Sequence, residues 1–122
     1  KGMVAAIRPN GTDKIKAYSI DLDEYSEFGR EEADAPKEQW ARYIFGVARE
    51  MQKRGGKVGG FDTAFAGDVP LGAGMSSSAA LESTYAVALN ELFGNDIDRF
   101  ELARIGQSTE HKFVGDNFGT ID

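Results

Sequence analysis

The segment from Ser76 to Phe93 most constrains the fold, because it has a helix-forming composition and is apolar almost all round. A helix without a wide polar face has to be buried by other elements. The segment is entered through "PLGAGM" and left through Gly94-Asn95, so glycine or proline marks both of its ends. We therefore expect a core built around this helix, with the other segments covering it.

Three other segments are typical of β-strands. Residues 2–8 form an apolar run that ends at Pro9-Asn10-Gly11, which predicts a strand and a turn. Residues 14–22 and 59–66 alternate in the period of two that a half-buried strand requires. We expect the first two strands to form a hairpin and all three to share one sheet. In the second strand, one side consists of Ile15, Ala17 and Ser19 and the other of Lys16, Tyr18 and Ile20. In the third, one side consists of Phe61, Thr63 and Phe65 and the other of Asp62, Ala64 and Ala66.

Two amphipathic helices are predicted on either side of the apolar one. Residues 38–54 carry apolar side chains at helical spacing and end in "KRGG", a typical helix C-terminus. Residues 98–113 begin with Asp98 followed three residues later by Glu101, which resembles a capping box. The first stripe consists of Trp40, Tyr43, Ile44, Val47, Ala48 and Met51, and the second of Leu102, Ile105, Gly106, Thr109 and Phe113.

Composition excludes several classes of function. The 122 residues suit one domain. The chain has no cysteine, which excludes disulfides and thiolate metal sites. Its net charge is −6 and its basic residues are not clustered, so no nucleic-acid partner is expected. No apolar run approaches the ~20 residues that span a bilayer, so no membrane association is expected. We expect a cytoplasmic protein.

The entry into the apolar helix has the features of an anion site. A helix N-terminus presents unpaired N–H groups and a partial positive charge, and glycines before it allow a ligand to approach the backbone closely. Phosphate is a common ligand of such a site. There is no Lys or Arg between Gly67 and Asp98, so this is not a Walker A loop. Phosphates would depend here on backbone dipoles and a metal ion. The alternative interpretation is an ordinary loop with a serine N-cap.

The same stretch carries a resemblance to a known family. "PLGAGMSSSAALE" is similar to the second motif of the superfamily of galactokinase, homoserine kinase, mevalonate kinase and phosphomevalonate kinase, P-x-G-x-G-[LM]-x-S-S-A-A. The triple serine, the Leu81-Glu82 pair, "QWARYIFGV" and "STEHKFVG" resemble galactokinases in particular. The resemblance implies an α/β (α+β) fold, with a mixed sheet packed by helices, similar to ribosomal protein S5 domain 2. It also implies that residues 1–122 are part of an N-terminal kinase domain, without the upstream sugar motif and the C-terminal domain.

The resemblance also implies the roles of individual residues. Asp122 matches the catalytic aspartate and, with Gly119, the sugar-binding segment. Ser77 and Glu110 match the ligands of Mg²⁺, and Trp40 resembles a tryptophan near the adenine. The alternative interpretation of Glu110 is an acidic residue on the solvated face of a helix. The alternative interpretation of Trp40 is an anchor of the hydrophobic core. The residues that match the ATP-phosphate loop are Gly72, Gly74, Ser76, Ser77 and Ser78.

The function implied for the longer protein is phosphorylation of the anomeric hydroxyl of galactose, with ATP and Mg²⁺. Two alternatives are a kinase of another sugar, such as N-acetylgalactosamine, and a non-catalytic binding or regulatory relative. A third is a structural fragment with no function of its own. We expect the isolated chain to be inactive. We also expect it to self-associate, because missing neighbouring strands would leave sheet edges exposed.

Overall fold

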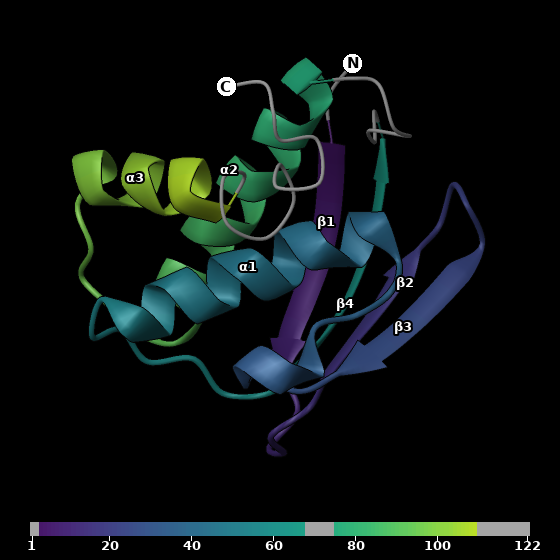
Figure 1. Cartoon of the computed structure of the whole chain (residues 1–122), viewed down its shortest axis with the longest axis horizontal. Coiled ribbons are helices and arrows are strands. Elements are labelled where there is room, and N and C mark those ends of the chain that lie inside the picture. Colours follow the sequence, from purple (N-terminus) through teal and green to yellow (C-terminus); the bar gives the residue numbers. More distant parts are fainter. Residues whose placement is uncertain (1–2, 68–74, 110–122) are drawn as a thin grey trace.

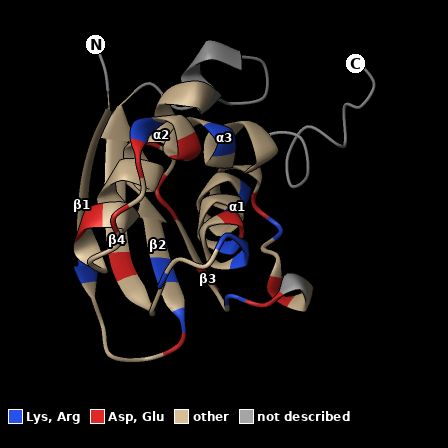
Figure 2. Ribbon diagram, turned by 90° about the vertical axis from the view of Figure 1, so that its left-hand side faces the viewer, with Lys and Arg blue, Asp and Glu red and all other residues tan. Residues whose placement is uncertain are grey.

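The computed structural model of the chain describes residues 3–67 and 75–109. It has two layers, a β-sheet and a set of helices that cover one face of the sheet (Figures 1 and 2). This is the mixed α+β architecture that the sequence predicts. The elements are β1 (Met3–Pro9), β2 (Ile15–Ser19), β3 (Glu24–Phe28), the 3-10 helix η1 (Glu32–Asp34), α1 (Gln39–Lys53), β4 (Phe61–Gly67), α2 (Met75–Leu92) and α3 (Arg99–Thr109).

The strand order is β1-β4-β2-β3, so the predicted hairpin between the first two strands is wrong. Strand β4 lies between them, antiparallel to β1 and parallel to β2. The connection from β1 to β2 crosses the start of β4 at Gly60. The backbone amide of Asn10 donates to the Gly60 carbonyl at 3.2 Å. The backbone amide of Gly60 donates to the Thr12 carbonyl at 3.0 Å. A Cβ at Gly60 would lie 2.3 Å from the Thr12 carbonyl oxygen, so this crossing requires glycine.

Strand β3 is missing from the sequence-based prediction. The predicted strand 14–22 ends at Ser19, and the chain turns back to form β3, antiparallel to β2. Asp23, in this turn, has a φ of 55°, an uncommon conformation for a residue other than glycine. Within β3, Ser26 and Phe28 are buried whereas Tyr25 and Glu27 are exposed. Because each face mixes a polar with an apolar or aromatic residue, β3 has no clear alternation of polarity.

The core lies between the sheet and the helices, and the predicted alternation in β2 and β4 and the predicted stripe of α1 are confirmed. Every residue of the predicted α1 stripe is buried, and so are the inward residues of β2 and β4. Trp40 on α1 packs against Phe65 on β4, with ring centroids 5.4 Å apart. Helix α1 ends at Lys53, and Gly55 follows with a φ of 89°, as the "KRGG" signal predicts.

Helix α2 is buried on one side rather than all round. Leu81, Tyr85 and Leu89 have no exposed surface, whereas 48% of Val87 is exposed. The expectation of burial on all sides is therefore wrong within the described residues. The reason is that α1, α3 and β1 contact only part of the helix circumference. Among the described residues, no helix is long and apolar enough to cross a membrane.

Helix α3 begins as predicted. The Asp98 carboxylate accepts a hydrogen bond of 2.9 Å from the Glu101 amide, which is one half of the predicted capping box. The Glu101 side chain instead forms an ion pair with Arg54 at the end of α1. Ile105 and Thr109 are buried as predicted. Positions 110–113 of the predicted helix lie outside the described residues.

Candidate functional site

The N-terminus of α2 is the part of the candidate phosphate site that the structure describes. β4 ends at Gly67 and α2 begins at Met75, so Ser76–Ser78 belong to the first turn of the helix. The N–H groups of a first helical turn have no partners within the helix and carry a partial positive charge. This backbone fits an anionic group such as phosphate. Gly72 and Gly74 lie outside the described residues.

A buried pair of hydroxyl groups anchors α2 on the sheet. The oxygens of Tyr85 on α2 and Thr63 on β4 lie 2.6 Å apart. The Thr63 hydroxyl donates to the Ala6 carbonyl of β1 at 2.8 Å, so the Tyr85 hydroxyl donates to Thr63. Burial raises the pKa of Tyr85 to about 12. The contact fixes the position of α2 relative to two strands.

Helices α2 and α3 form an antiparallel pair. At one end, the Asn90 side chain donates to the Ile97 carbonyl at 3.2 Å and accepts from the Ile97 amide at 3.1 Å. Toward the other end, Gly106 lies against the buried Glu82, where an added Cβ would be 3.7 Å from the Cβ of Glu82. α3 therefore runs back along α2, toward the end of α2 that carries the serines.

The other predicted site residues lie outside the described part of the chain. These are Glu110, Gly119 and Asp122, and His111 lies there too. Within residues 3–67 and 75–109, no three His, Cys, Asp or Glu side chains gather as a metal site would require. The predicted Mg²⁺ ligands Ser77 and Glu110 thus stay a prediction. A carboxylate and a serine hydroxyl are hard oxygen ligands, which is the donor set that Mg²⁺ prefers.

Trp40 is a core residue. Only 3% of its surface is exposed, and its indole Nε1 donates to a carboxylate oxygen of Glu24 at 2.7 Å. Its ring packs against Phe65 in the interior. These contacts agree with the core-anchor interpretation.

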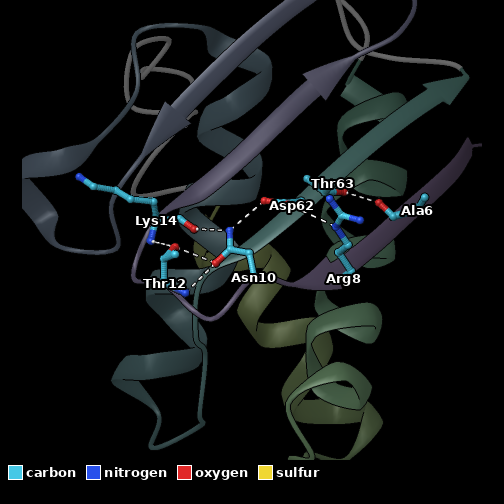
Figure 3. A network of polar contacts seen from close by, with 7 residues as sticks. All are labelled: Ala6, Arg8, Asn10, Thr12, Lys14, Asp62 and Thr63. Carbon is cyan, nitrogen blue, oxygen red and sulfur yellow. Dashed lines mark hydrogen bonds and ion pairs between the residues drawn. The ribbon is translucent and has the colours of Figure 1, made fainter.

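A polar network at one end of the sheet was not predicted from the sequence (Figure 3). Asp62 on β4 accepts from Asn10 Nδ2 at 2.8 Å and from Arg8 Nε at 3.1 Å. The hydrogen bond from Asn10 and the adjacent Arg8 lower the pKa of Asp62. The side-chain oxygen Oδ1 of Asn10 also accepts from the backbone amide and the hydroxyl of Thr12. Asn10 at the predicted turn was the only sequence signal for this network. It did not reveal Asp62 as the partner, because Asp62 is 52 residues away in the sequence.

Comparisons with known proteins identify the family. The profile of the GHMP kinases N terminal domain matches residues 42–122. Galactokinase from Lactococcus lactis, solved in complex with galactose, is 31% identical over 93% of this chain, with a TM-score of 0.81. Mevalonate kinase from Methanococcus jannaschii is 17% identical over 93% of this chain, with a TM-score of 0.71. Homoserine kinase from Cytophaga hutchinsonii is 22% identical over 94% of this chain, with a TM-score of 0.65.

The last two likenesses concern the fold alone, whereas the family profile covers most of the chain. The chain spans 30%, 37% and 34% of the three solved structures, respectively. Because the profile matches residues 42–122, the chain belongs to the GHMP kinase family, within the N-terminal domain.

Proposed function

We propose that the protein containing this chain is a galactokinase, which transfers the γ-phosphoryl group of ATP to the anomeric hydroxyl of galactose. The similarity to the galactose-bound galactokinase supports this choice of substrate, because it combines 31% identity with a TM-score of 0.81. We further propose that residues 1–122 supply only part of the N-terminal domain, and that the chain alone does not phosphorylate galactose. The chain spans only 30% of the galactokinase, which supports both parts of this proposal.

The likeness to the galactokinase is the observation that carries the proposal, and the antiparallel pairing of α2 and α3 supports its metal site. Gly106 lies against Glu82. Glu110 follows Gly106 by four residues, and Ser78 precedes Glu82 by four residues. Ser78 lies about one helical turn from Glu82, toward the N-terminus of α2, and α3 runs toward the same end of the pair. The register therefore favours a site in which Glu110 and the serines at the start of α2 serve one ligand, as the proposed Mg²⁺–ATP complex requires.

The proposed roles divide the chemistry among three groups. Backbone N–H groups at residues 72–78 bind the phosphates of ATP. Ser77 and Glu110 hold Mg²⁺, which when bound neutralises charge on the phosphates. Asp122 orients or deprotonates the attacking sugar hydroxyl, with Gly119 beside the sugar. A group with this last role must lie within hydrogen-bond reach of the hydroxyl in the complex with substrate.

A coupled assay for ADP release tests the proposed substrate in the longer protein. We expect release that depends on galactose, and little release with mevalonate or homoserine. A preference for N-acetylgalactosamine would reject galactose as the substrate but retain the sugar kinase. No release with any of these acceptors, from a protein that still binds ATP, would favour a non-catalytic relative. The isolated 122-residue chain is expected to give no galactose-dependent ADP release.

The proposed metal ligand has a test of its own. Glu110→Ala in the longer protein should raise the Mg²⁺ concentration that half-saturates ADP release. Glu91→Ala is the matched control, because Glu91 is exposed near the other end of α2. An unchanged Mg²⁺ requirement in Glu110→Ala would contradict the assignment of Glu110.

A further inference from the structure

The outer face of the sheet, which the helices leave uncovered, carries a row of alternating charges. The row runs across all four strands through Arg8 on β1, Asp62 on β4, Lys16 on β2 and Glu27 on β3. The strand registers pair Arg8 with Asp62, Asp62 with Lys16, and Lys16 with Glu27. Arg8, Lys16 and Glu27 are exposed. The order of charges across the sheet is therefore positive, negative, positive, negative.

A second row beside the first carries small side chains in one half and large side chains in the other. Its register pairs join Ala6 to Ala64, Ala64 to Tyr18, and Tyr18 to Tyr25. The alanines occupy the β1–β4 half of the face and the tyrosines occupy the β2–β3 half. A hollow of about 540 Å³ lies on this face, lined by residues that include both alanines, both tyrosines and Asp62. Tyr25 is 54% exposed and Tyr18 is 36% exposed, so their side chains are accessible to a partner.

Both rows are complementary to their own reversed order. When a row is reversed and laid on itself, the position of Arg8 meets that of Glu27, and the position of Asp62 meets that of Lys16. In the second row, Ala64 meets Tyr18 and Ala6 meets Tyr25. A two-fold axis that runs parallel to the strands, between β4 and β2, produces this reversal. Two-fold interfaces are of this isologous kind, in which one patch contacts its own copy.

We propose that the outer face of the sheet is a docking surface for a second copy of this chain, in a two-fold symmetric dimer. The tyrosines of each copy enter the hollow above the alanines of the other. The two charge rows meet with opposite signs. The two sheets pack face to face, with their strands aligned within about 30° because of sheet twist. This inference is independent of the proposed kinase activity.

The area of the outer face determines how strongly the two copies are expected to bind each other. Four strands spaced by about 4.8 Å, each about 20 Å long, give a footprint of roughly 400 Å² per copy. Stable interfaces bury about 800 Å² of accessible surface per partner, so this face corresponds to a weak, concentration-dependent dimer. Val4 and Ile20, which are 74% and 51% exposed, extend the apolar part of the face beyond the tyrosines.

The alternating signs decide which partner fits. A nucleic acid would meet the carboxylates of Asp62 and Glu27 in the same row as the two cations. An anionic membrane surface would meet the same two acids. A second copy in the reversed order meets opposite charges at every position of the row, which is the arrangement that steers association and fixes register.

Sedimentation velocity of the 122-residue chain, between about 1 µM and about 1 mM, tests the dimer. We expect a concentration-dependent shift from monomer to dimer. Ala64→Lys places a long charged side chain on the alanine half of the hollow and should weaken the dimer at least tenfold. Ala103→Lys is the matched control, because Ala103 is exposed on α3, in the helix layer. A monomer at all concentrations, or a dimer unaffected by Ala64→Lys, would overturn the proposal.

Mixing two charge variants tests the register, and it cannot be mimicked by a folding defect. Arg8→Glu places a carboxylate against Glu27 of the other copy, and Glu27→Arg places a guanidinium against Arg8 of the other copy. Each variant alone should dimerise at least tenfold more weakly than the original chain. In an equimolar mixture, both contacts join opposite charges, and dimerisation should return toward that of the original chain. A mixture that stays as weak as its components would overturn the two-fold arrangement.

Discussion

The Tyr85 hydroxyl on α2 lies 2.6 Å from Thr63 Oγ1 on β4, and both residues are buried. Through Thr63 the contact continues to the Ala6 carbonyl of β1. One polar chain thus joins the helix that bears the candidate phosphate site to two strands of the sheet. The orientation of the N-terminus of α2 depends on this anchor as well as on the apolar packing around it.

Tyr85→Phe removes the hydroxyl and keeps the ring. We expect a loss of about 1 kcal/mol in the free energy of unfolding, the usual net contribution of one hydrogen bond. The loss stays small because Thr63 keeps its bond to Ala6. Urea denaturation measures it. Tyr25→Phe is the control, since that side chain is on the exposed face of the sheet. Equal effects of the two substitutions would contradict the anchoring role of Tyr85.

The raised pKa of Tyr85 determines how the stability of the fold should change at high pH. Its pKa is about 12 in the fold, against 10.0 for an ordinary tyrosine, because burial disfavours the phenolate. The unfolded chain therefore loses this proton first. The stability that Tyr85 contributes is fully present below pH 10 and is lost as the pH rises toward 12, by up to about 3 kcal/mol. Urea denaturation from pH 8 to 12 should show a shallower decline in Tyr85→Phe than in the original chain. Parallel declines would contradict the raised pKa.

Replacing Gly106 and Gly60 by alanine should change the free energy of unfolding in opposite directions. Gly106 lies within α3, and an added Cβ would meet Glu82 at 3.7 Å, an ordinary contact distance. Gly106→Ala should therefore raise the free energy of unfolding by about 0.5–1 kcal/mol through helix propensity. Gly60→Ala should lower it by about 2 kcal/mol or more, because its Cβ would lie 2.3 Å from a carbonyl oxygen. Thermal and urea denaturation of both variants check this. Destabilisation by Gly106→Ala would contradict the described α2–α3 contact.

The sequence predicted the faces of the elements better than their pairing. The inward faces of β2 and β4 and the stripe of α1 follow from local periodicity, which burial on one side imposes. Pairing is a non-local property. β1 and β2 are separated by β4 because the connection crosses Gly60, and nothing in residues 2–22 records that crossing. β3 was missed because Tyr25 points outward while Ser26 points inward.

In the candidate site, too, the local motif could be predicted from the sequence, whereas the contacts between elements could not. The motif from Gly72 to Ser78 was recognisable because a phosphate loop needs glycines and a helix start at fixed spacing. The contact of Glu82 with Gly106, which supports a common site for the serines and Glu110, joins two helices and has no local signal in the sequence. The Tyr85–Thr63 anchor is equally non-local, since its members were interpreted only as parts of apolar faces.

Asp122 has the most specific proposed chemical role. In the longer protein, Asp122→Asn should leave the affinity for ATP nearly unchanged and lower the turnover number by at least about 100-fold, as expected when a group that handles a proton is lost. Asp116→Asn in the same segment is the control and should retain most of the turnover. Steady-state ADP release and equilibrium ATP binding separate the two effects. Normal turnover in Asp122→Asn would remove Asp122 from the mechanism.

We propose that nucleotide phosphates bind at the N-terminus of α2. Calorimetric titration of Mg²⁺–ATP into the longer protein tests it most directly, with Gly74→Val compared to the original sequence. A valine side chain blocks close approach of phosphate to the backbone, and loss of such contacts costs about 1–3 kcal/mol. Ala79→Val, at an exposed position of α2, is the control and should bind normally. We expect Mg²⁺–ATP to bind at least about tenfold more weakly to Gly74→Val. Unchanged affinity in that variant would contradict it.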